Sequence, residues 1–325
     1  MENIRIKNFK FLSSNNYYDI HGVMWIPEGK VRAIVQISHG MAEYIERYDD
    51  FARFLVSHGI LVVGNDHMGH GKSINEEKNL GYFSVPIIGL PKKYRDKFSS
   101  GALVVKDLHR ITMQVKKHYK NVPYILLGHS MGSFMARRYM MEYGDDIDGA
   151  ILIGTGNSSD QHIKMGKTLL NSIGKVKGDR YKSKLAYDVM YAGYNSKVPN
   201  KKTDNDWICS DENVIERYNN DSKCGFMFPI NGLKALVWTI DYVTRPEHVE
   251  MIPKNLKTLF LSGQDDPVGA YGEEVKIAYE NMKIAGIRDV KMKLYKGMRH
   301  EILNEVHKEI VYEDIYKWIC KEMKL

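Results

Sequence analysis

The fold is decided by one short stretch of sequence, Tyr124-Ile125-Leu126-Leu127-Gly128-His129-Ser130-Met131-Gly132. Its first four residues predict a buried strand, and the residues that follow it have helical periodicity. Between strand and helix the turn must be so sharp that side chains two residues on either side of Ser130 would clash, so glycine is required at Gly128 and Gly132. The pattern predicts a strained turn that holds the Ser130 hydroxyl above the sheet as a nucleophile.

Similar apolar runs recur on both sides of this stretch and alternate with helical segments. Because nearly continuous apolarity suits a strand that is covered on both faces, the runs predict a parallel, doubly wound α/β sheet flanked by helices. The predicted strands are 33–38, 61–65, 124–127, 150–154, 258–262 and 290–295, and the predicted helices are 44–58, 101–120, 131–143, 271–284 and 305–323.

The two ends of this pattern define the domain organisation. Two further strands, 4–12 and 18–26, are separated only by an Asn-rich turn and predict an antiparallel hairpin at the sheet edge. The alternation of strand and helix stops in the interval 155–253, which is too long for a plain loop. We therefore expect an α/β core made of residues 1–154 and 254–325, with 155–253 inserted as a mainly helical cap.

A serine nucleophile near neutral pH needs a histidine to accept its proton and a carboxylate to orient that histidine. In α/β sheets of this kind the acid and then the base follow the serine, each after the carboxyl end of a strand. Asp265 and Asp266 follow the 258–262 strand, and His300 follows the 290–295 strand. The order predicts His300 as the base and leaves both aspartates open as its partner.

Acyl transfer also needs backbone N–H groups that bind the oxyanion. One predicted donor is the N–H of Met131, directly after the nucleophile, and the second is the N–H of Met41, in the turn after the 33–38 strand. His39 and Gly40 precede Met41, and we expect His39 to support this loop rather than to react.

A glycine-rich loop, Asp66-His67-Met68-Gly69-His70-Gly71-Lys72-Ser73, invites two other interpretations. A phosphate-binding loop is excluded because the Walker spacing is missing. A zinc site at His67 and His70 lacks the clustered carboxylates or cysteines that would complete it. We expect a tight structural loop beside the active site, no metal and no cofactor.

Composition limits the remaining classes of function. With 43% hydrophobic and 27% charged residues, the chain has the make-up of a globular protein. Its net charge of +7 is modest and no nucleic-acid motif accompanies it, so nucleic acid is not expected as a partner. Without a signal peptide, a membrane-spanning run or disulfide-like cysteine spacing, the sequence predicts a cytoplasmic protein.

Taken together, these motifs resemble the monoacylglycerol lipase and bacterial lysophospholipase branch of the α/β-hydrolases, which also contains serine aminopeptidases. The resemblance extends from about residue 10 to the end. It is carried by the Ser130 turn and the loop 66–73, and by three further motifs: Ser38-His39-Gly40-Met41-Ala42-Glu43, Arg47-Tyr48, and Arg299-His300-Glu301 with Leu303-Asn304-Glu305. It implies a triad of Ser130, Asp266 and His300, and hydrolysis of lipid esters that have one acyl chain.

Three alternatives stay open from the sequence. Relatives with the same motifs include short-chain esterases and proline aminopeptidases, and a catalytically silent hydrolase fold that only binds a ligand is a third possibility.

The interval from Lys164 to Lys202 contains ten Lys or Arg residues against Asp179 and Asp188. We hypothesise that this basic part of the cap contacts anionic membranes or lysophospholipid head groups.

Overall fold

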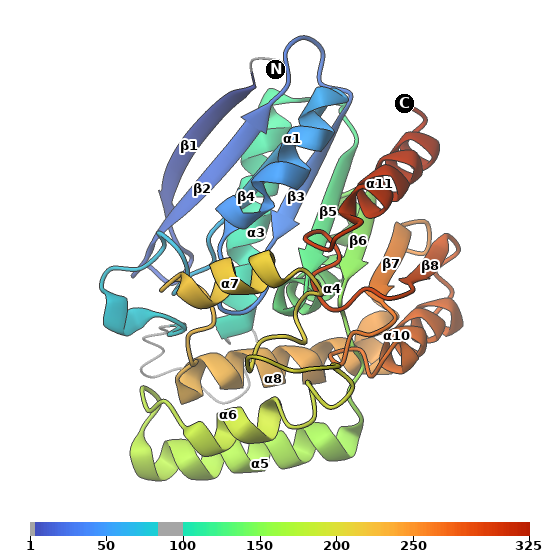
Figure 1. Cartoon of the computed structure of the whole chain (residues 1–325). Helices are drawn as coiled ribbons and strands as arrows, with labels where there is room; N and C mark the ends of the chain where they lie inside the picture. Colours follow the sequence, from blue (N-terminus) through green and yellow to red (C-terminus); the bar gives the residue numbers. More distant parts are fainter. Residues whose placement is uncertain (1–3, 84–99) are drawn as a thin grey trace.

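The computed structural model describes residues 4–83 and 100–325. These residues form an eight-stranded sheet in the order β1-β2-β4-β3-β5-β6-β7-β8 (Figure 1). β2 runs antiparallel to both β1 and β4, and all later pairs are parallel. The strands are β1 (Arg5–Leu12), β2 (Asp19–Ile26), β3 (Ala33–Ser38), β4 (Ile60–Asn65), β5 (Tyr124–His129), β6 (Gly149–Ile153), β7 (Lys257–Gly263) and β8 (Val290–Tyr295).

The burial of the strands follows from their place in the sheet. Every residue of β3, β4, β5 and β6 is buried, as expected for parallel strands with helices on both faces. β1 lies at the edge and is mostly exposed, with Phe9 and Phe11 packed against the core. The mostly parallel sheet and its antiparallel edge hairpin agree with the predicted fold class.

Helices cover the two faces of the sheet and divide its core into two layers. In one layer α1 and α11 pack against the strands, and in the other α3, α4 and α10 pack against them. The short helix η1 precedes α1, and η2 and η3 lie in loops. These elements are η1 (Ile45–Tyr48), α1 (Asp49–Ser57), η2 (Glu77–Asn79), α3 (Ser100–His118), α4 (Met131–Tyr143), η3 (Gly144–Asp146), α10 (Glu273–Ile284) and α11 (Lys308–Met323).

Between β6 and β7 the chain forms helices and no strand. Figure 1 shows these helices across the end of the sheet at which the parallel strands finish. α8 packs against α5 on one side and against α3 and α4 on the other, which joins the insertion to the helix that follows Ser130. The helices are α5 (Asp160–Lys177), α6 (Lys184–Met190), α7 (Glu212–Asn220), α8 (Ile230–Thr244) and α9 (Pro246–Val249).

Side chains cap the first three of these helices. Ser159, Ser183 and Asp211 each accept a hydrogen bond from a backbone N–H in the first turn of α5, α6 and α7.

We propose that residues 155–253 are a cap on a core made of 1–154 and 254–325. In the described part of the chain, no helix combines the length and the apolar character needed to cross a membrane.

Candidate active site

Ser130 sits in a strained turn between β5 and α4. Its φ of 52° and ψ of −123° lie in a region that side chains rarely adopt. A Cβ atom on Gly128 would lie 2.4 Å from the carbonyl oxygen of Gly132, and one on Gly132 would lie 1.9 Å from that of Ser38. The turn therefore closes only with glycine at both positions, which is the steric reason for the sequence pattern.

His300 and Asp266 meet at the carboxyl ends of β7 and β8. His300 Nδ1 is 2.9 Å from Asp266 Oδ2, and the Asp266 side chain is fully buried. The carboxylate also accepts hydrogen bonds from Ser262 Oγ at 3.0 Å and from the N–H of Val268 at 2.9 Å. Asp265 is exposed to solvent. Of the two aspartates that the sequence left open, Asp266 is the one that holds the histidine.

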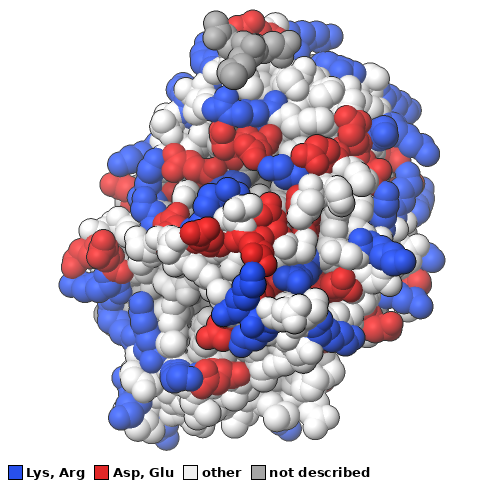
Figure 2. Space-filling view, viewed as in Figure 1, with Lys and Arg blue, Asp and Glu red and all other residues white. Residues whose placement is uncertain are grey.

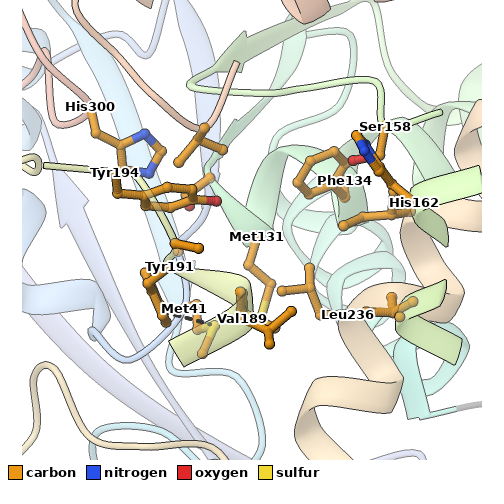
Figure 3. A pocket seen from close by; sticks show the side chains of 18 of the residues that line it. Met41, Met131, Phe134, Ser158, His162, Val189, Tyr191, Tyr194, Leu236 and His300 are labelled. Atoms are coloured by element: carbon orange, nitrogen blue, oxygen red, sulfur yellow. Dashed lines mark hydrogen bonds between the residues drawn. The ribbon is translucent and has the colours of Figure 1, made fainter. Parts of the chain in front are cut away.

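Ser130 and His300 line one cavity of about 760 Å³ (Figure 3). His300 Nε2 is buried and has no hydrogen-bond partner among the described residues, so it is not bonded to Ser130 Oγ in this structure. Catalytic hydrogen bonds of this kind often tighten only when substrate is bound. The imidazole thus has one nitrogen fixed by Asp266 and the other open towards the cavity.

The two predicted oxyanion donors, Met41 and Met131, line the same cavity. Met131 is the first residue of α4, where backbone N–H groups have no acceptor within the helix. Around Met41 the backbone is fixed on both sides. Gly40 N donates to Glu43 Oε1 at 2.5 Å, and the N–H of Ala42 donates to His70 Nε2 at 3.4 Å. Among the described residues, the N–H of Met41 donates to no backbone carbonyl in the turns and loops.

His39 supports the loop that precedes Met41. Its Nδ1 donates to the carbonyl oxygen of Gly40 at 2.8 Å, and its Nε2 accepts from the N–H of His67 at 2.9 Å. Burial lowers the pKa of His39 and of His67, and lowers that of His70 to about 3. The three rings are therefore neutral at physiological pH. They pack between the Met41 loop and the loop 66–73 and form hydrogen bonds there.

The glycine-rich loop that follows β4 shows no metal site. Within residues 4–83 and 100–325, no three His, Cys, Asp or Glu side chains gather in a way that would hold a metal ion. Asp66 instead accepts hydrogen bonds from the N–H groups of Ile45 and Lys72, at 2.9 and 2.7 Å. It closes the loop against the turn that carries Met41.

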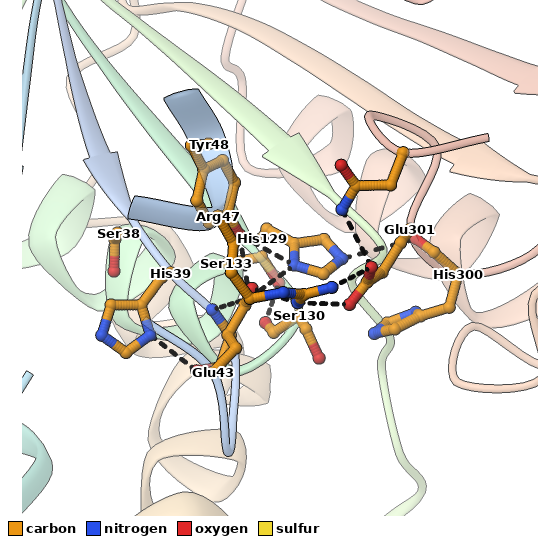
Figure 4. Close-up of polar contacts among 12 residues, drawn as sticks. Ser38, His39, Glu43, Arg47, Tyr48, His129, Ser130, Ser133, His300 and Glu301 are labelled. Atoms are coloured by element: carbon orange, nitrogen blue, oxygen red, sulfur yellow. Dashed lines mark hydrogen bonds and ion pairs between the residues drawn. The ribbon is translucent and has the colours of Figure 1, made fainter. Parts of the chain in front are cut away.

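A buried polar network behind Ser130 was not predicted from the sequence (Figure 4). Glu43 Oε1 lies 3.1 Å from His129 Nδ1, and Glu43 Oε2 accepts from Arg47 at 2.8 Å. Arg47 also forms two hydrogen bonds with Glu301, both of 2.7 Å. Because Glu43, His129 and Glu301 adjoin the Met41 loop, Ser130 and His300, the network joins the three loops of the site.

The charges in this network follow from their partners. Burial opposes the ionisation of Glu43, but His129 and Arg47 hold the pKa of its carboxyl well below its usual range. Burial likewise opposes protonation of His129, and the Glu43 carboxylate nevertheless raises the pKa of that imidazole. The sequence held one signal for this network, since Glu43, Arg47 and Glu301 lie inside the motifs that carry the family resemblance.

Residues of the insertion also contact the loops that carry His300 and Met41. Arg299 Nη1 donates to the carbonyl oxygens of Asp206 and Cys209 at 2.6 and 2.8 Å. The ring of Trp207 packs on His300, with 5.1 Å between centroids. On the other side, the Tyr218 hydroxyl reaches the carbonyl oxygen of Ala42 at 3.4 Å. The segment 206–225 therefore contacts the loops of the site directly and also lines the cavity.

Comparison with known proteins agrees with this architecture. The model of the Hydrolase_4 family, described as serine aminopeptidase, S33, matches residues 29–307. The monoacylglycerol lipase of Mycolicibacterium smegmatis is 24% identical over 96% of this chain and 98% of its own length. The human monoglyceride lipase is 27% identical over 91% of this chain and 85% of its own length.

A solved structure extends the comparison to three dimensions. A thermostable carboxyl esterase from Bacillus coagulans, in complex with glycerol, is 30% identical and superposes with a TM-score of 0.84 over 99% of this chain and 100% of that one. The predicted α/β-hydrolase fold and the predicted family are confirmed. The chain belongs to the Hydrolase_4 (serine aminopeptidase, S33) family of α/β-hydrolases, in the branch that contains the monoacylglycerol lipases.

Proposed function

We propose that the protein is a serine hydrolase of carboxylic esters in which Ser130 is the nucleophile, His300 the base and Asp266 the residue that orients the base. One observation carries the proposal. The cavity that contains the strained Ser130 also contains His300, whose Nδ1 is held by a buried carboxylate 2.9 Å away and whose Nε2 has no partner among the described residues.

The reaction follows from these positions. Ser130 Oγ attacks the ester carbonyl while its proton moves to His300 Nε2, and the N–H groups of Met41 and Met131 bind the oxyanion. When the tetrahedral intermediate collapses, the bond to the alcohol breaks and His300 gives its proton to the leaving oxygen. Water then attacks the acyl-serine, with His300 as base, and releases the fatty acid. Every step is carried by side chains and backbone of the chain, so the proposal needs no cofactor.

The lining of the cavity supports a lipid substrate with one acyl chain. Burying each methylene group contributes about 0.8 kcal/mol, so an apolar channel favours long acyl groups. Relatives of this chain are named monoacylglycerol or monoglyceride lipases. Apolar side chains from the turn before η1 and from α4, α5, α6 and α8 form most of the wall: Met41, Met131, Phe134, Leu169, Leu170, Val189, Met190, Leu236, Val237 and Ile240.

A series of substrates tests this proposal. We expect kcat/KM for nitrophenyl esters to rise from acetate towards longer acyl groups, and monoacylglycerol to be hydrolysed. Ser130→Ala should lose activity by about a millionfold in kcat. A preference for prolyl amides would indicate an aminopeptidase, and a preference for acetate esters would indicate a short-chain esterase. Wild-type protein without any hydrolytic activity would indicate a hydrolase fold that only binds a ligand.

A further inference from the structure

One carboxylate in the cavity has no part in the proposed chemistry. Glu274, in the first turn of α10, lines the same cavity as Ser130 and His300. Its Oε2 accepts a hydrogen bond from the N–H of Asn157 at 2.9 Å, which is its one donor among the described residues. The side chain is only partly buried, so the carboxylate is held in place and still open to the cavity.

The loop around Glu274 is fixed from behind. Arg137 of α4 is fully buried and donates to the carbonyl oxygen of Gly156 at 2.7 Å and to Asn157 Oδ1 at 3.1 Å. A Cβ atom on Gly156 would lie 2.8 Å from Glu274 Oε2, so the backbone approaches the carboxylate closely. Burial raises the pKa of Glu274, and the hydrogen bond from the N–H of Asn157 acts in the opposite direction.

Glu274 is held by a loop that begins at the His300 end of the cavity. The loop that contacts Glu274 through Gly156 begins at Gly154, where a Cβ atom would lie 2.9 Å from His300 Cε1. Tyr194 is at the same end, because its ring and that of His300 both pack on Trp207, with centroids 4.9 and 5.1 Å away. Figure 3 shows the Tyr194 hydroxyl pointing into the cavity beside His300.

The position beside His300 identifies the part of the substrate that faces Glu274. In ester hydrolysis the base gives its proton to the leaving alcohol, so the alcohol must lie next to His300. The acyl chain takes the apolar side, which Val189 and Leu236 line in Figure 3. Glu274 and the Tyr194 hydroxyl therefore face the alcohol.

The charges of the lining decide which alcohols fit. Its described residues include Glu43, Glu274 and Glu301, and neither lysine nor arginine. Glu43 and Glu301 are both paired with Arg47, whereas Arg137 reaches Glu274 only from behind the loop of Gly156. The other basic side chains of the lining are the imidazoles of His129, His162 and His300, of which His129 lies against Glu43 and His300 against Asp266. An anionic group in this part of the cavity would therefore meet the Glu274 carboxylate with no lysine or arginine in the described lining to offset it.

We propose that Glu274 is a specificity-determining residue that selects esters of neutral polyols or cationic alcohols and rejects esters whose alcohol carries a phosphate. The inference rests on the proposed ester hydrolysis and extends it to the class of alcohol. Hydroxyl groups donate hydrogen bonds to the carboxylate, and a cation pairs with it, while a phosphate is repelled.

A matched pair of substrates tests the proposal. 1-Octanoylglycerol and 1-octanoylglycerol 3-phosphate share the acyl chain and the glycerol and differ only in the phosphate. We expect wild-type kcat/KM to favour the neutral ester by at least about tenfold, and Glu274→Lys to raise the relative rate of the phosphate ester by about tenfold. Glu274→Gln, whose amide oxygen can still accept from the N–H of Asn157, should give an intermediate ratio.

The neighbouring residue supplies the control. Glu273→Lys makes the same change of charge at an exposed position of the same helix turn and should leave the ratio near its wild-type value. Hydrolysis of a nitrophenyl ester by each variant reports that the catalytic residues are intact. Equal wild-type rates for the two octanoyl esters, or equal shifts in Glu273→Lys and Glu274→Lys, would overturn the proposal.

A binding measurement separates this inference from the proposed function. Ether analogues of the two octanoyl esters cannot be hydrolysed, and their dissociation constants with Ser130→Ala protein require no turnover. We expect the phosphate-free analogue to bind at least about tenfold more tightly. If wild-type protein hydrolyses no ester, the proposed function fails, yet this ratio still supports or refutes the selection of alcohols by Glu274.

Discussion

Asp265 and Asp266 are adjacent in sequence and differ in every physical respect that matters for catalysis. Asp266 is fully buried and bound to His300 Nδ1, whereas Asp265 is exposed. We expect Asp266→Asn to lower kcat by about ten-thousandfold, because the amide would favour the wrong tautomer of the base. Asp265→Asn is the matched control and should stay within about threefold of wild type. Comparable losses in the two variants would contradict the assigned triad.

The buried histidines beside the oxyanion loop predict a dependence of stability on pH. Burial lowers the pKa of His70 to about 3, whereas an unfolded histidine titrates near ~6.5. The folded state therefore binds fewer protons, so this contribution to stability is complete above about pH 6.5 and is lost as the pH falls towards 3. Across that window, each such histidine lowers the free energy of unfolding by up to about 1.4 kcal/mol for every unit by which the pH falls.

Urea denaturation at pH 7.5 and pH 5 measures this effect. The drop in the free energy of unfolding between the two values should be smaller in His70→Asn than in wild type, by about 2 kcal/mol. His118→Asn, at an exposed position of α3, is the control and should keep the wild-type drop. Identical pH dependence in all three proteins would show that His70 does not titrate differently on unfolding.

At the level of residues, the sequence predicted those parts of the site that local geometry dictates. The glycines around Ser130 follow from the sterics of one turn and could be identified from a few adjacent letters. The buried network could not, because His129 is 86 residues from Glu43, and Arg47 is 254 residues from Glu301. Pairings over such separations exist only once the sheet has brought the loops together.

At the level of elements, the segment 206–225 of the insertion holds the loop that carries His300, the proposed base. Arg299 donates to the carbonyl oxygens of Asp206 and Cys209, next to the imidazole of His300. We expect Arg299→Gln to lower kcat by about ten- to a hundredfold with a smaller change in KM, since a shift of about 1 Å in a catalytic group costs that much.

Arg288→Gln supplies the comparison for this prediction. Arg288 is exposed in the loop before β8, and its replacement should leave both constants near their wild-type values. Circular dichroism distinguishes a displaced base from a protein that has failed to fold. A purely KM effect in Arg299→Gln would place the segment 206–225 in substrate binding instead.

The strands were predicted more accurately than the ends of the helices. The predicted ranges 33–38 and 290–295 coincide with β3 and β8. Continuous apolarity marks β3 clearly, and all of its residues are buried. The expectation that 290–295 is also covered on both faces was wrong, because β8 has lysines at alternate positions and lies half-buried at the sheet edge. The predicted helix 44–58 is divided into η1 and α1. The helix predicted from 271 begins at Glu273, because Ala270, Tyr271 and Gly272 adopt positive φ values, which periodicity does not reveal.

At the level of the whole molecule, we propose that the basic part of the insertion contacts an anionic membrane. Figure 2 shows basic side chains around the lower edge of the molecule, where α5 lies in Figure 1. On α5 and α6 the side chains of Met165, Val176 and Leu185 are 61%, 78% and 60% exposed. Exposed apolar side chains among lysines suit an anionic bilayer surface, to which each lysine contributes about 1 kcal/mol.

Co-sedimentation with vesicles tests this contact. We expect binding to increase with the fraction of anionic lipid, and the double substitution Lys175→Glu with Lys177→Glu, in α5, to weaken it by about tenfold or more. Lys7→Glu with Lys10→Glu makes the same change of charge on the exposed β1 and should have little effect. Binding that does not depend on anionic lipid would exclude the basic cap as a membrane contact.

The central claim is that Ser130 forms a covalent acyl intermediate, and mass spectrometry of the intact protein tests it most directly. Wild-type protein quenched in acid during turnover of a nitrophenyl ester should gain the mass of one acyl group, and peptide mapping should place that group on Ser130. Ser130→Ala should gain none. An acyl group on another residue, or undiminished hydrolysis by Ser130→Ala, would contradict the account.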